Sequence, residues 1–392
     1  MLEVVLHDRA QWREHLLPMA FTRPVGAFRV GILSLNEKWQ LLLGAPVSFF
    51  TEPYLQEKFK APAAASTYLV IRADVCPTPS LVDILLTLPE ECLLEKDGNW
   101  IAYKVKQWIP EPDRERLQVY RFEEGLHRIQ FLEDVYLQNA SQLLYDFDLL
   151  TKDNVSASLH PSNTVIGDKL FVGDNVQAFC CTFNTLHGAI YIADDAVLEE
   201  GSHLRGPIAI GKGARVKMGS RLYPNVSVAS YCTIGGEVNN TVMWENSSKG
   251  HDGYLGCAVI GEGCNIGAGS SNSNLQNNWQ QVELYDYNLK DRRKTNHWKV
   301  GVFMGDFVMC GINSSITTGS IMGVGAQVSM SNIIPKFVPD FSWITDAKTE
   351  VYVWAKFERM LKERAAIRKK QIQEVDLRIL WEIYCLTKRE GF

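Results

Sequence analysis

The chain has 392 residues, about two and a half times the length of a typical domain, so two or three separate cores are expected. Charged residues make up 22% and hydrophobic residues 46%, a composition typical of globular proteins that excludes a largely disordered chain. The formal net charge of -5 gives no general attraction for nucleic acid or anionic membranes. We therefore expect small-molecule partners, with neither nucleic acid nor a membrane among them.

Three further features predict a cytoplasmic protein. The longest apolar run, residues 41–50, is too short to cross a bilayer, and the N-terminus, with Glu3 and Asp8, does not resemble a secretory signal. The nine cysteines include no Cys-x-x-Cys pair, which is typical of buried thiols in a reducing compartment.

Residues 1–131 alternate short apolar strands with helical stretches, which predicts an α/β domain with a largely parallel sheet. The expected elements are strands at 4–6, 46–50 and 68–71 and a helix at 80–88. Apolar residues between 132 and 150 have helical spacing, so we predict a helical linker over residues 132–160.

From residue 161 the dominant pattern is a six-residue repeat. Every sixth residue from 192 to 234 is aliphatic: Ile192, Leu198, Leu204, Ile210, Val216, Leu222, Val228 and Ile234. This period predicts a parallel β-helix, in which three repeats form one triangular coil, over residues 161–338. The repeat is interrupted after Ile234 and again after Leu275, and such insertions usually form loops at a functional face.

The last segment, residues 346–392, is rich in charged residues with apolar residues between them and predicts one or two C-terminal helices. We interpret its basic run, residues 362–370, as a solvated helix face.

One part of the repeat region concentrates residues that can carry chemistry. It reads Gly-His-Asp-Gly-Tyr at residues 250–254, Asn-Ile-Gly-Ala-Gly at 265–269 and Asn at 274. This segment is similar to the acetyltransferase site of the bifunctional UDP-N-acetylglucosamine pyrophosphorylase/glucosamine-1-phosphate acetyltransferase family, the GlmU-like proteins. The solenoid also resembles that of the hexapeptide acyltransferases, which implies a left-handed β-helix.

Acetyl transfer to a sugar amine needs a base for the amine proton and donors for the oxyanion. Histidine titrates near neutral pH, so we predict His251 as the general base and Glu237 as the carboxylate that orients it. The resemblance implies that the backbone N–H of Ala268 binds the acetyl carbonyl and that Asn274 holds the acceptor near the thioester. It also implies sugar contacts at Tyr254 and Asn265. Asparagines at β-helix corners can instead serve the turn backbone, which stays an alternative for Asn265 and Asn274.

The sequence departs from this family at two positions. The family reads its sugar phosphate with an Arg and a Lys, and the matching positions here are Tyr223 and Asn239. The acceptor therefore differs, or other cations bind the phosphate, for which the insertion at 276–299 offers candidates: Lys290, Arg292, Arg293 and Lys294.

The N-terminal residues Thr22-Arg23-Pro24, with Lys38 and with Asp74 at a strand end, resemble a branch of GlmU-like sugar nucleotidyltransferases common in Bacteroidetes. The resemblance implies substrate contacts at Arg23 and Lys38 and a Mg²⁺ ligand at Asp74. A salt bridge or a helix cap is the alternative for Arg23 and Asp74. The glycine-rich phosphate loop of such enzymes is missing, because residues 7–12 read His-Asp-Arg-Ala-Gln-Trp.

These features predict an acetyl-CoA-dependent N-acetyltransferase acting on an amino-sugar phosphate (glucosamine-1-phosphate-like) or a nucleotide sugar, in nucleotide-sugar and cell-envelope biosynthesis. Its nucleotidyltransferase domain is expected to be degenerate, with Mg²⁺ needed only if that domain is active. The resemblance implies a homotrimer with acetyl-CoA between subunits. Two alternatives stay open: a full bifunctional enzyme that also makes UDP-N-acetylglucosamine from UTP, and a catalytically silent scaffold that binds sugar nucleotides.

Overall fold

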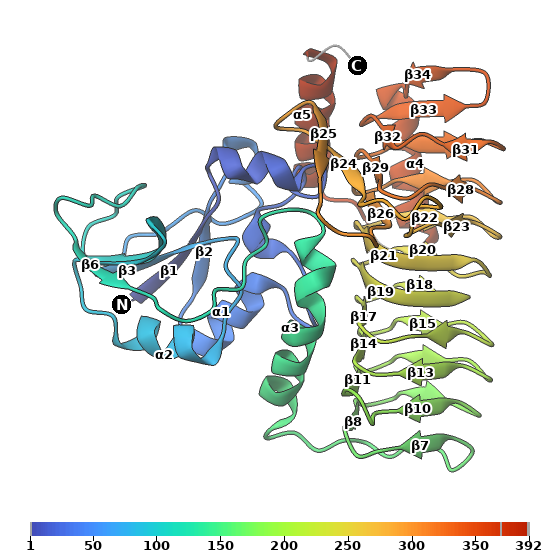
Figure 1. The fold of residues 1–392 in the computed structure, drawn as a ribbon, viewed down its shortest axis with the longest axis horizontal. Helices are drawn as coiled ribbons and strands as arrows, with labels where there is room; N and C mark the ends of the chain where they lie inside the picture. The colour runs from blue at the N-terminus through green and yellow to red at the C-terminus, as the bar shows by residue number, and fades with distance from the viewer. Residues whose placement is uncertain (1, 369–370, 390–392) are drawn as a thin grey trace.

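The computed structural model describes residues 2–368 and 371–389. Figure 1 shows an N-terminal α/β domain on one side and a tall β-helix on the other, with a long helix running between them. Two C-terminal helices pack near the upper end of the β-helix. The α/β domain, left-handed β-helix and helical tail expected from the sequence are therefore confirmed as the fold class.

The N-terminal domain is built on a six-stranded sheet in the order β2-β1-β3-β5-β4-β6. β1 pairs in parallel with β2 and β3, whereas the pairs β3–β5 and β4–β5 are antiparallel and β4–β6 is parallel. The strands are β1 (Leu2–His7), β2 (Val47–Phe50), β3 (Thr67–Arg72), β4 (Cys92–Lys96), β5 (Asn99–Val105) and β6 (Gln118–Arg121). The three predicted strands are confirmed, and the sheet is mixed because a β-hairpin follows β3.

Helices α1 (Leu35–Leu43) and α2 (Pro79–Thr87) belong to the same domain. α1 begins in a capping box formed by Ser34 and Glu37, and α2, which the sequence predicted, begins with Pro79 behind the cap Thr78. Three short 3-10 helices complete the domain: Gln11–Leu16, Val25–Ala27 and Pro53–Leu55.

Helix α3 (Asp134–Thr151), also predicted, lies between the domain and the β-helix (Figure 1). It contacts strands β17, β19 and β21 of the β-helix. Asn139 accepts a hydrogen bond from Ser227, and the Tyr136 ring stacks on Phe303. α3 is therefore packed on the solenoid rather than acting as a free linker.

The β-helix has three faces of stacked strands. The first face contains β7 (Thr164–Ile166), β10 (Thr182–Asn184), β13 (His203–Arg205), β16 (Arg221–Leu222), the beginnings of β19 (Glu237–Met243) and β21 (Tyr254–Ile260), β23 (Ser271–Asn272), β28 (Ser315–Ile316) and β31 (Ile333–Ile334). The second contains β8 (Leu170–Val172), β11 (Ile190–Ile192), β14 (Ile208–Ile210), β17 (Val226–Val228), the ends of β19 and β21, β26 (Val302–Met304), β29 (Ser320–Met322) and β32 (Phe337–Val338).

The third face contains β9 (Gln177–Ala178), β12 (Val197–Leu198), β15 (Arg215–Val216), β18 (Thr233–Ile234), β20 (Ser248–Lys249), β22 (Asn265–Ile266), β27 (Met309–Cys310), β30 (Gln327–Ser329), β33 (Ser342–Thr345) and β34 (Thr349–Val351). Parallel pairing in strict register, for example Ile190 with Ile208 and Ile208 with Val226, stacks one aliphatic residue on the next inside the coil. The repeat positions predicted to face inward form one continuous core.

The second face also turns apolar side chains outward. Val242, Val259, Phe303 and Ile321 project from it, and with Trp244 they join the buried core of the N-terminal domain. The two parts therefore share one hydrophobic core, which fixes their relative position.

Two segments outside the coils pack against both parts. The insertion forms the antiparallel hairpin β24 (Glu283–Asp286) and β25 (Asp291–Lys294), and the tail forms α4 (Trp354–Ile367) and α5 (Glu374–Arg389). The basic run at 362–370 is not purely a solvated face: Arg364 and Arg368 donate hydrogen bonds to the carbonyl oxygen of Asn246. Residues 369 and 370 of that run lie outside the described residues.

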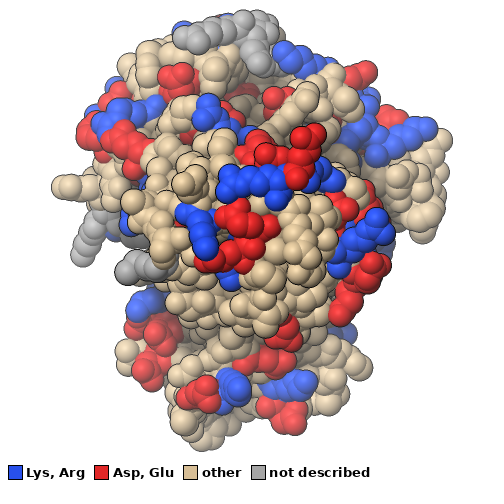
Figure 2. Space-filling view, turned by 90° about the vertical axis from the view of Figure 1, so that its left-hand side faces the viewer, with Lys and Arg blue, Asp and Glu red and all other residues tan. Residues whose placement is uncertain are grey.

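Acidic and basic side chains alternate over the face that carries the N-terminal domain (Figure 2). Among the described residues, no helix is both long and apolar enough to span a bilayer.

Candidate functional site

Two of the predicted catalytic residues, His251 and Ala268, lie at one corner of the β-helix. Ile234 pairs with Lys249, and Ser248 pairs with Asn265, so His251 and Ala268 occupy the same corner in adjacent coils. A hydrogen bond of 3.1 Å from Gly269 N to Asp252 O joins the two turns. His251 is exposed at this corner, where an imidazole can reach a ligand.

The turn around Ala268 leaves its amide available. The Ala268 carbonyl accepts from Asn313 N at 2.7 Å, and the neighbouring amide of Gly267 donates to Cys310 O. Among the described residues, the Ala268 N–H donates no hydrogen bond. Asn265 lies at the preceding strand with its side chain exposed, so it is also accessible.

Tyr254 and Asn274 are brought together directly. The Asn274 Nδ2 donates to the Tyr254 hydroxyl at 3.0 Å and lies 3.4 Å from the buried Cys257 Sγ. Burial raises the pKa of Tyr254, so its hydroxyl stays protonated at neutral pH and can donate a hydrogen bond to a ligand. These contacts connect the start of β21 with the loop that follows β23.

Glu237 lies one coil below Tyr254, with which it pairs in register. Its carboxylate is 3.7 Å from Arg221 Nε. Within the described part of the chain, no hydrogen bond joins Glu237 to His251. The backbone joins the two segments, because the Glu237 N–H donates a hydrogen bond of 3.3 Å to the carbonyl of Gly253, two residues after His251.

Lys249 is a residue of this site that sequence reasoning missed. It points into the coil at a position where its stacking neighbours are Ile234 and Ile266, and only 1% of it is exposed. Its Nζ donates to the carbonyl oxygen of His251 at 2.6 Å. Burial lowers the pKa of Lys249 to about 8. One feature of the sequence could have identified it: Lys249 occupies a repeat position that is otherwise aliphatic, next to the Gly-His turn.

An open groove of about 630 Å³ begins beside Asn274. Its walls come from the loop after β23 and from the next coils, and include Asn272, Ser273, Gln276, Thr318 and Lys336. Burial and the nearby Arg292 lower the pKa of Lys336. The site therefore combines an exposed histidine, a tyrosine and asparagine pair, and a polar groove with Lys336 in its wall.

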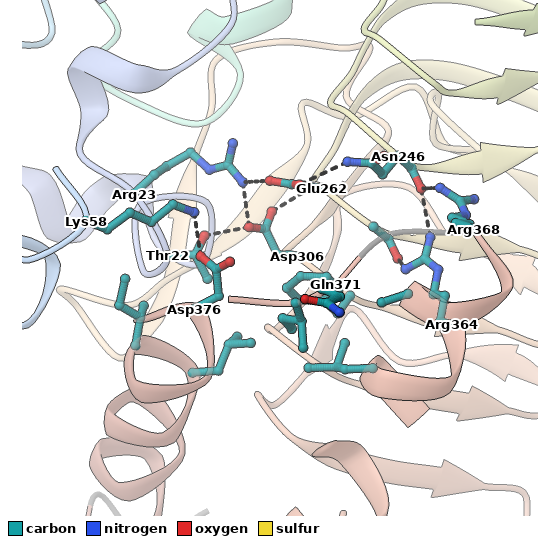
Figure 3. A pocket seen from close by; sticks show the side chains of 17 residues that line it. Thr22, Arg23, Lys58, Asn246, Glu262, Asp306, Arg364, Arg368, Gln371 and Asp376 are labelled. Carbon is teal, nitrogen blue, oxygen red and sulfur yellow. Dashed lines mark hydrogen bonds and ion pairs between the residues drawn. The ribbon is translucent and has the colours of Figure 1, made fainter. Parts of the chain in front are cut away.

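The N-terminal candidates are not brought to this corner. Figure 3 shows Arg23 between the domain and the β-helix, where its Nη2 lies 2.9 Å from Glu262 and 2.7 Å from Asp306. Thr22 donates to the same Asp306 carboxylate at 2.6 Å. The guanidinium also lies over the Trp244 ring at 4.6 Å. Arg23 therefore forms salt bridges that hold the two parts together. A salt bridge was the alternative to a substrate contact in the sequence analysis.

Lys38 and Asp74 are also enclosed in ion pairs. Lys38 has no exposed surface and pairs with Asp146 of α3 at 3.0 Å, so the expected substrate contact does not fit its environment. Asp74 is fully buried between Arg72 at 3.1 Å and Arg128 at 2.6 Å. With both oxygens bound to guanidinium groups, this carboxylate does not fit a Mg²⁺ site. The described residues contain no cluster of three potential metal ligands.

The segment after β1 offers no phosphate loop. Asp8 is buried and accepts from Arg13 Nε at 3.2 Å and from Val25 N at 2.7 Å. Among the insertion's cations, Arg293 pairs with Glu133 and Asp286, so it is not available to a phosphate.

Comparison with known proteins agrees with this architecture. Residues 4–155 match a family described as sugar nucleotidyl transferase. The bifunctional protein GlmU of Acinetobacter baylyi is 31% identical over 186 residues, covering 45% of this chain and 35% of the relative. The bifunctional sugar-1-phosphate nucleotidylyltransferase/acetyltransferase of Sulfurisphaera tokodaii is 32% identical over 170 residues, covering 43% of this chain and 40% of the relative.

Among solved structures, the polySia-specific acetyltransferase NeuO is similar over 53% of this chain and all of its own length, with 14% identity and a TM-score of 0.28. The β-helix is therefore assigned from the pairing of its strands and not from this similarity. The chain joins an α/β domain to a β-helix. In sequence, the chain is similar to a sugar nucleotidyl transferase family over residues 4–155 and to parts of bifunctional GlmU proteins. It spans little more than a third of the length of the curated relatives that it matches.

Lys249→Met should abolish a pH dependence of stability. Because the folded protein releases this proton near pH 8 and the unfolded chain near 10.5, the unfolded state binds more protons between these values. The wild-type free energy of unfolding should therefore rise by about 2 kcal/mol between pH 7.5 and 9.5 from this residue alone.

Urea unfolding at both pH values measures the difference. Lys212→Met, at a lysine with 53% of its side chain exposed, is the matched control and should retain the rise. An equal rise in the Lys249→Met protein would show that folding does not lower the pKa of this lysine.

Proposed function

We propose that the protein is an acetyl-CoA-dependent N-acetyltransferase of nucleotide-sugar biosynthesis, acting in the cytosol on an amino sugar that carries a phosphate or a nucleotide. The observation that carries the proposal is the placement of His251 and the free Ala268 amide at one corner, beside the Tyr254–Asn274 pair. The names of the curated relatives support acetyl transfer and sugar phosphates as its chemistry.

In this mechanism Tyr254, Asn274 and Asn265 hold the sugar with its amine toward His251. The amine nitrogen attacks the thioester carbonyl carbon, and the His251 imidazole takes the amine proton as the C–N bond forms. The Ala268 N–H donates to the oxyanion of the tetrahedral intermediate. When the C–S bond breaks, the imidazolium returns the proton to the leaving thiolate, so the products are the acetamido sugar and free coenzyme A.

Lys249 acts in this mechanism as a positioning residue. Its hydrogen bond to the His251 carbonyl holds the Gly-His turn from inside the coil. Glu237 would orient the imidazole after rotation of its side chain from Arg221. The groove beside Asn274 is wide enough for an extended acyl donor, and Lys336 in its wall suits a phosphate of coenzyme A.

We further propose that the N-terminal domain does not turn over nucleotide. Its three candidate residues are bound in ion pairs with Glu262, Asp306, Asp146, Arg72 and Arg128. Residues 7–12 offer bulky side chains in place of a glycine loop. The match to the sugar nucleotidyl transferase family keeps the bifunctional enzyme as the second candidate function.

His251→Ala should reduce acetyl transfer at least about 10²-fold with the fold retained, which is the usual loss on removing a general base. Thiol release from acetyl-CoA with a panel of amino-sugar phosphates measures the rate, and circular dichroism checks the fold. His160→Ala, at an exposed histidine before the first coil, is the control. Near-parental turnover of the His251→Ala protein would remove this histidine from the mechanism.

Glu237→Gln should reduce the rate of acetyl transfer less than His251→Ala does, and should move the acidic limb of its pH profile.

Pyrophosphate release from UTP and a sugar 1-phosphate in the presence of Mg²⁺ should be absent or very slow. The physical reason is that a triphosphate at residues 7–12 would lose close backbone contacts worth about 1.5 to 3 kcal/mol each. Arg23→Ala is a poor probe here, since it also removes the contact with the β-helix. Robust Mg²⁺-dependent pyrophosphate release by the unaltered protein would establish the bifunctional enzyme instead.

We also propose a homotrimer with the site near a subunit contact. Met218 and Ile312 lie on the same corner as His251 and Ala268, and their exposed fractions are 67% and 69%. Sedimentation velocity at micromolar concentration should give a trimer. Met218→Glu with Ile312→Glu should dissociate it, whereas Ile367→Glu, at an apolar residue of α4 that is 83% exposed, should not. A monomeric unaltered protein would contradict the assignment.

A further inference from the structure

Two columns of outward-facing side chains run down the first face of the β-helix from Tyr254. Register pairing places Glu237, Arg221 and His203 below Tyr254, one coil apart. Two residues further along each strand, Asn239, Tyr223 and Arg205 form a parallel column. The order of side chains along this face is therefore fixed by the backbone ladder.

The lower part of these columns lines a surface groove of about 380 Å³. Its polar walls are His203, Arg205, Arg221 and Tyr223, all exposed to solvent. Of the carboxylates in the described ranges, only Glu237 approaches within 4 Å of these groups, at 3.7 Å from Arg221. Arg205 has no carboxylate partner among them. The groove is thus a basic surface with an aromatic side chain, and its uppermost arginine, Arg221, lies two coils below Tyr254.

The spacing of the cations selects between two kinds of acceptor. Adjacent strands lie about 4.8 Å apart, so Arg221 is about 10 Å and Arg205 about 14 Å down the face from Tyr254. In an amino-sugar 1-phosphate, four bonds separate the amine from the phosphorus, a span of at most about 6 Å. Such a ligand, held at Tyr254, ends near Glu237 and Asn239. A second phosphate and a nucleoside extend the ligand toward Arg221 and Arg205.

We propose that this groove binds the diphosphate and nucleoside of a nucleotide-linked amino sugar. Arg221 and Arg205 contact the phosphates, and the exposed Tyr223 ring offers a flat surface to the nucleoside. The inference rests on the proposed function, because that function places the sugar at Tyr254 and Asn274. It explains how an anionic acceptor is recognised by a chain that has Tyr223 and Asn239 where its relatives read phosphate with cations.

The double variant Arg205→Ala, Arg221→Ala tests this assignment in the full-length protein. With UDP-linked glucosamine as acceptor, its kcat/KM should fall about 10- to 100-fold, as expected for lost charge-assisted hydrogen bonds. With glucosamine 1-phosphate, the kcat/KM of the single variant Arg205→Ala, which leaves the Arg221–Glu237 pair in place, should stay near that of the unaltered protein. Arg215→Ala removes an arginine from the third face that pairs with Glu199, and should change neither value.

Calorimetric binding of UDP-linked glucosamine without acetyl-CoA gives a readout independent of acetyl transfer. Arginine-dependent binding in a protein that acetylates nothing would support the groove and overturn the proposed activity. Transfer to glucosamine 1-phosphate with no binding of the UDP-linked sugar would overturn the groove and leave the activity standing. Equal losses on both acceptors, or dissociation of the assembly in the double variant, would also overturn it.

Discussion

The parallel register of stacked coils is the constraint on which the site depends. Each strand pairs with the strand one coil away, so a residue in one coil fixes the position of its counterpart about 4.8 Å above or below. His251 lies under Ala268, and Tyr254 lies over Glu237, for this reason alone. A shift of one residue in β21 would turn Tyr254 inward and Leu255 outward, and would break the core as well as the site.

The site sits where this regular ladder is locally altered. β19 and β21 continue around a bend from the first face to the second, and the insertion after Asn274 leaves the coil to form a hairpin. Lys249 replaces an aliphatic side chain at an inward position of the same coil. Burying an ammonium group costs stability, so its hydrogen bond to the His251 carbonyl is consistent with selection for the site rather than for the core.

Apolar contacts and ion pairs hold the N-terminal domain against the β-helix. Val242, Val259, Phe303 and Ile321 of the solenoid belong to the same core as its own strands, and the Arg23 ion pairs lie across the junction. Removing one partner of such a buried pair is strongly destabilising. Under this account the domain stabilises one side of the β-helix, and the open corner is left for substrates.

The repeat region was predictable because its period of six is a local property, and so were β1, β2, β3, α2 and α3. A salt bridge was an open alternative for Arg23 and Asp74, but the partners of these residues and of Lys38 were not predictable, since the pairs form only when the chain folds. Arg23 and Asp306, for example, are joined across the domain junction. The inward position of Lys249 was not predictable either, because it depends on how the strands pair across an interruption of the six-residue repeat. The contacts of Arg364 and Arg368 depended on how α4 meets the coils.

A crystal structure of the protein with coenzyme A and an amino-sugar phosphate bound would test the central claim most directly. The account predicts the sugar amine within hydrogen-bond distance of the His251 imidazole, the sugar hydroxyls on Tyr254 and Asn274, and the coenzyme thiol facing the Ala268 amide. Ligands bound away from this corner, with His251 contacting solvent alone, would contradict it.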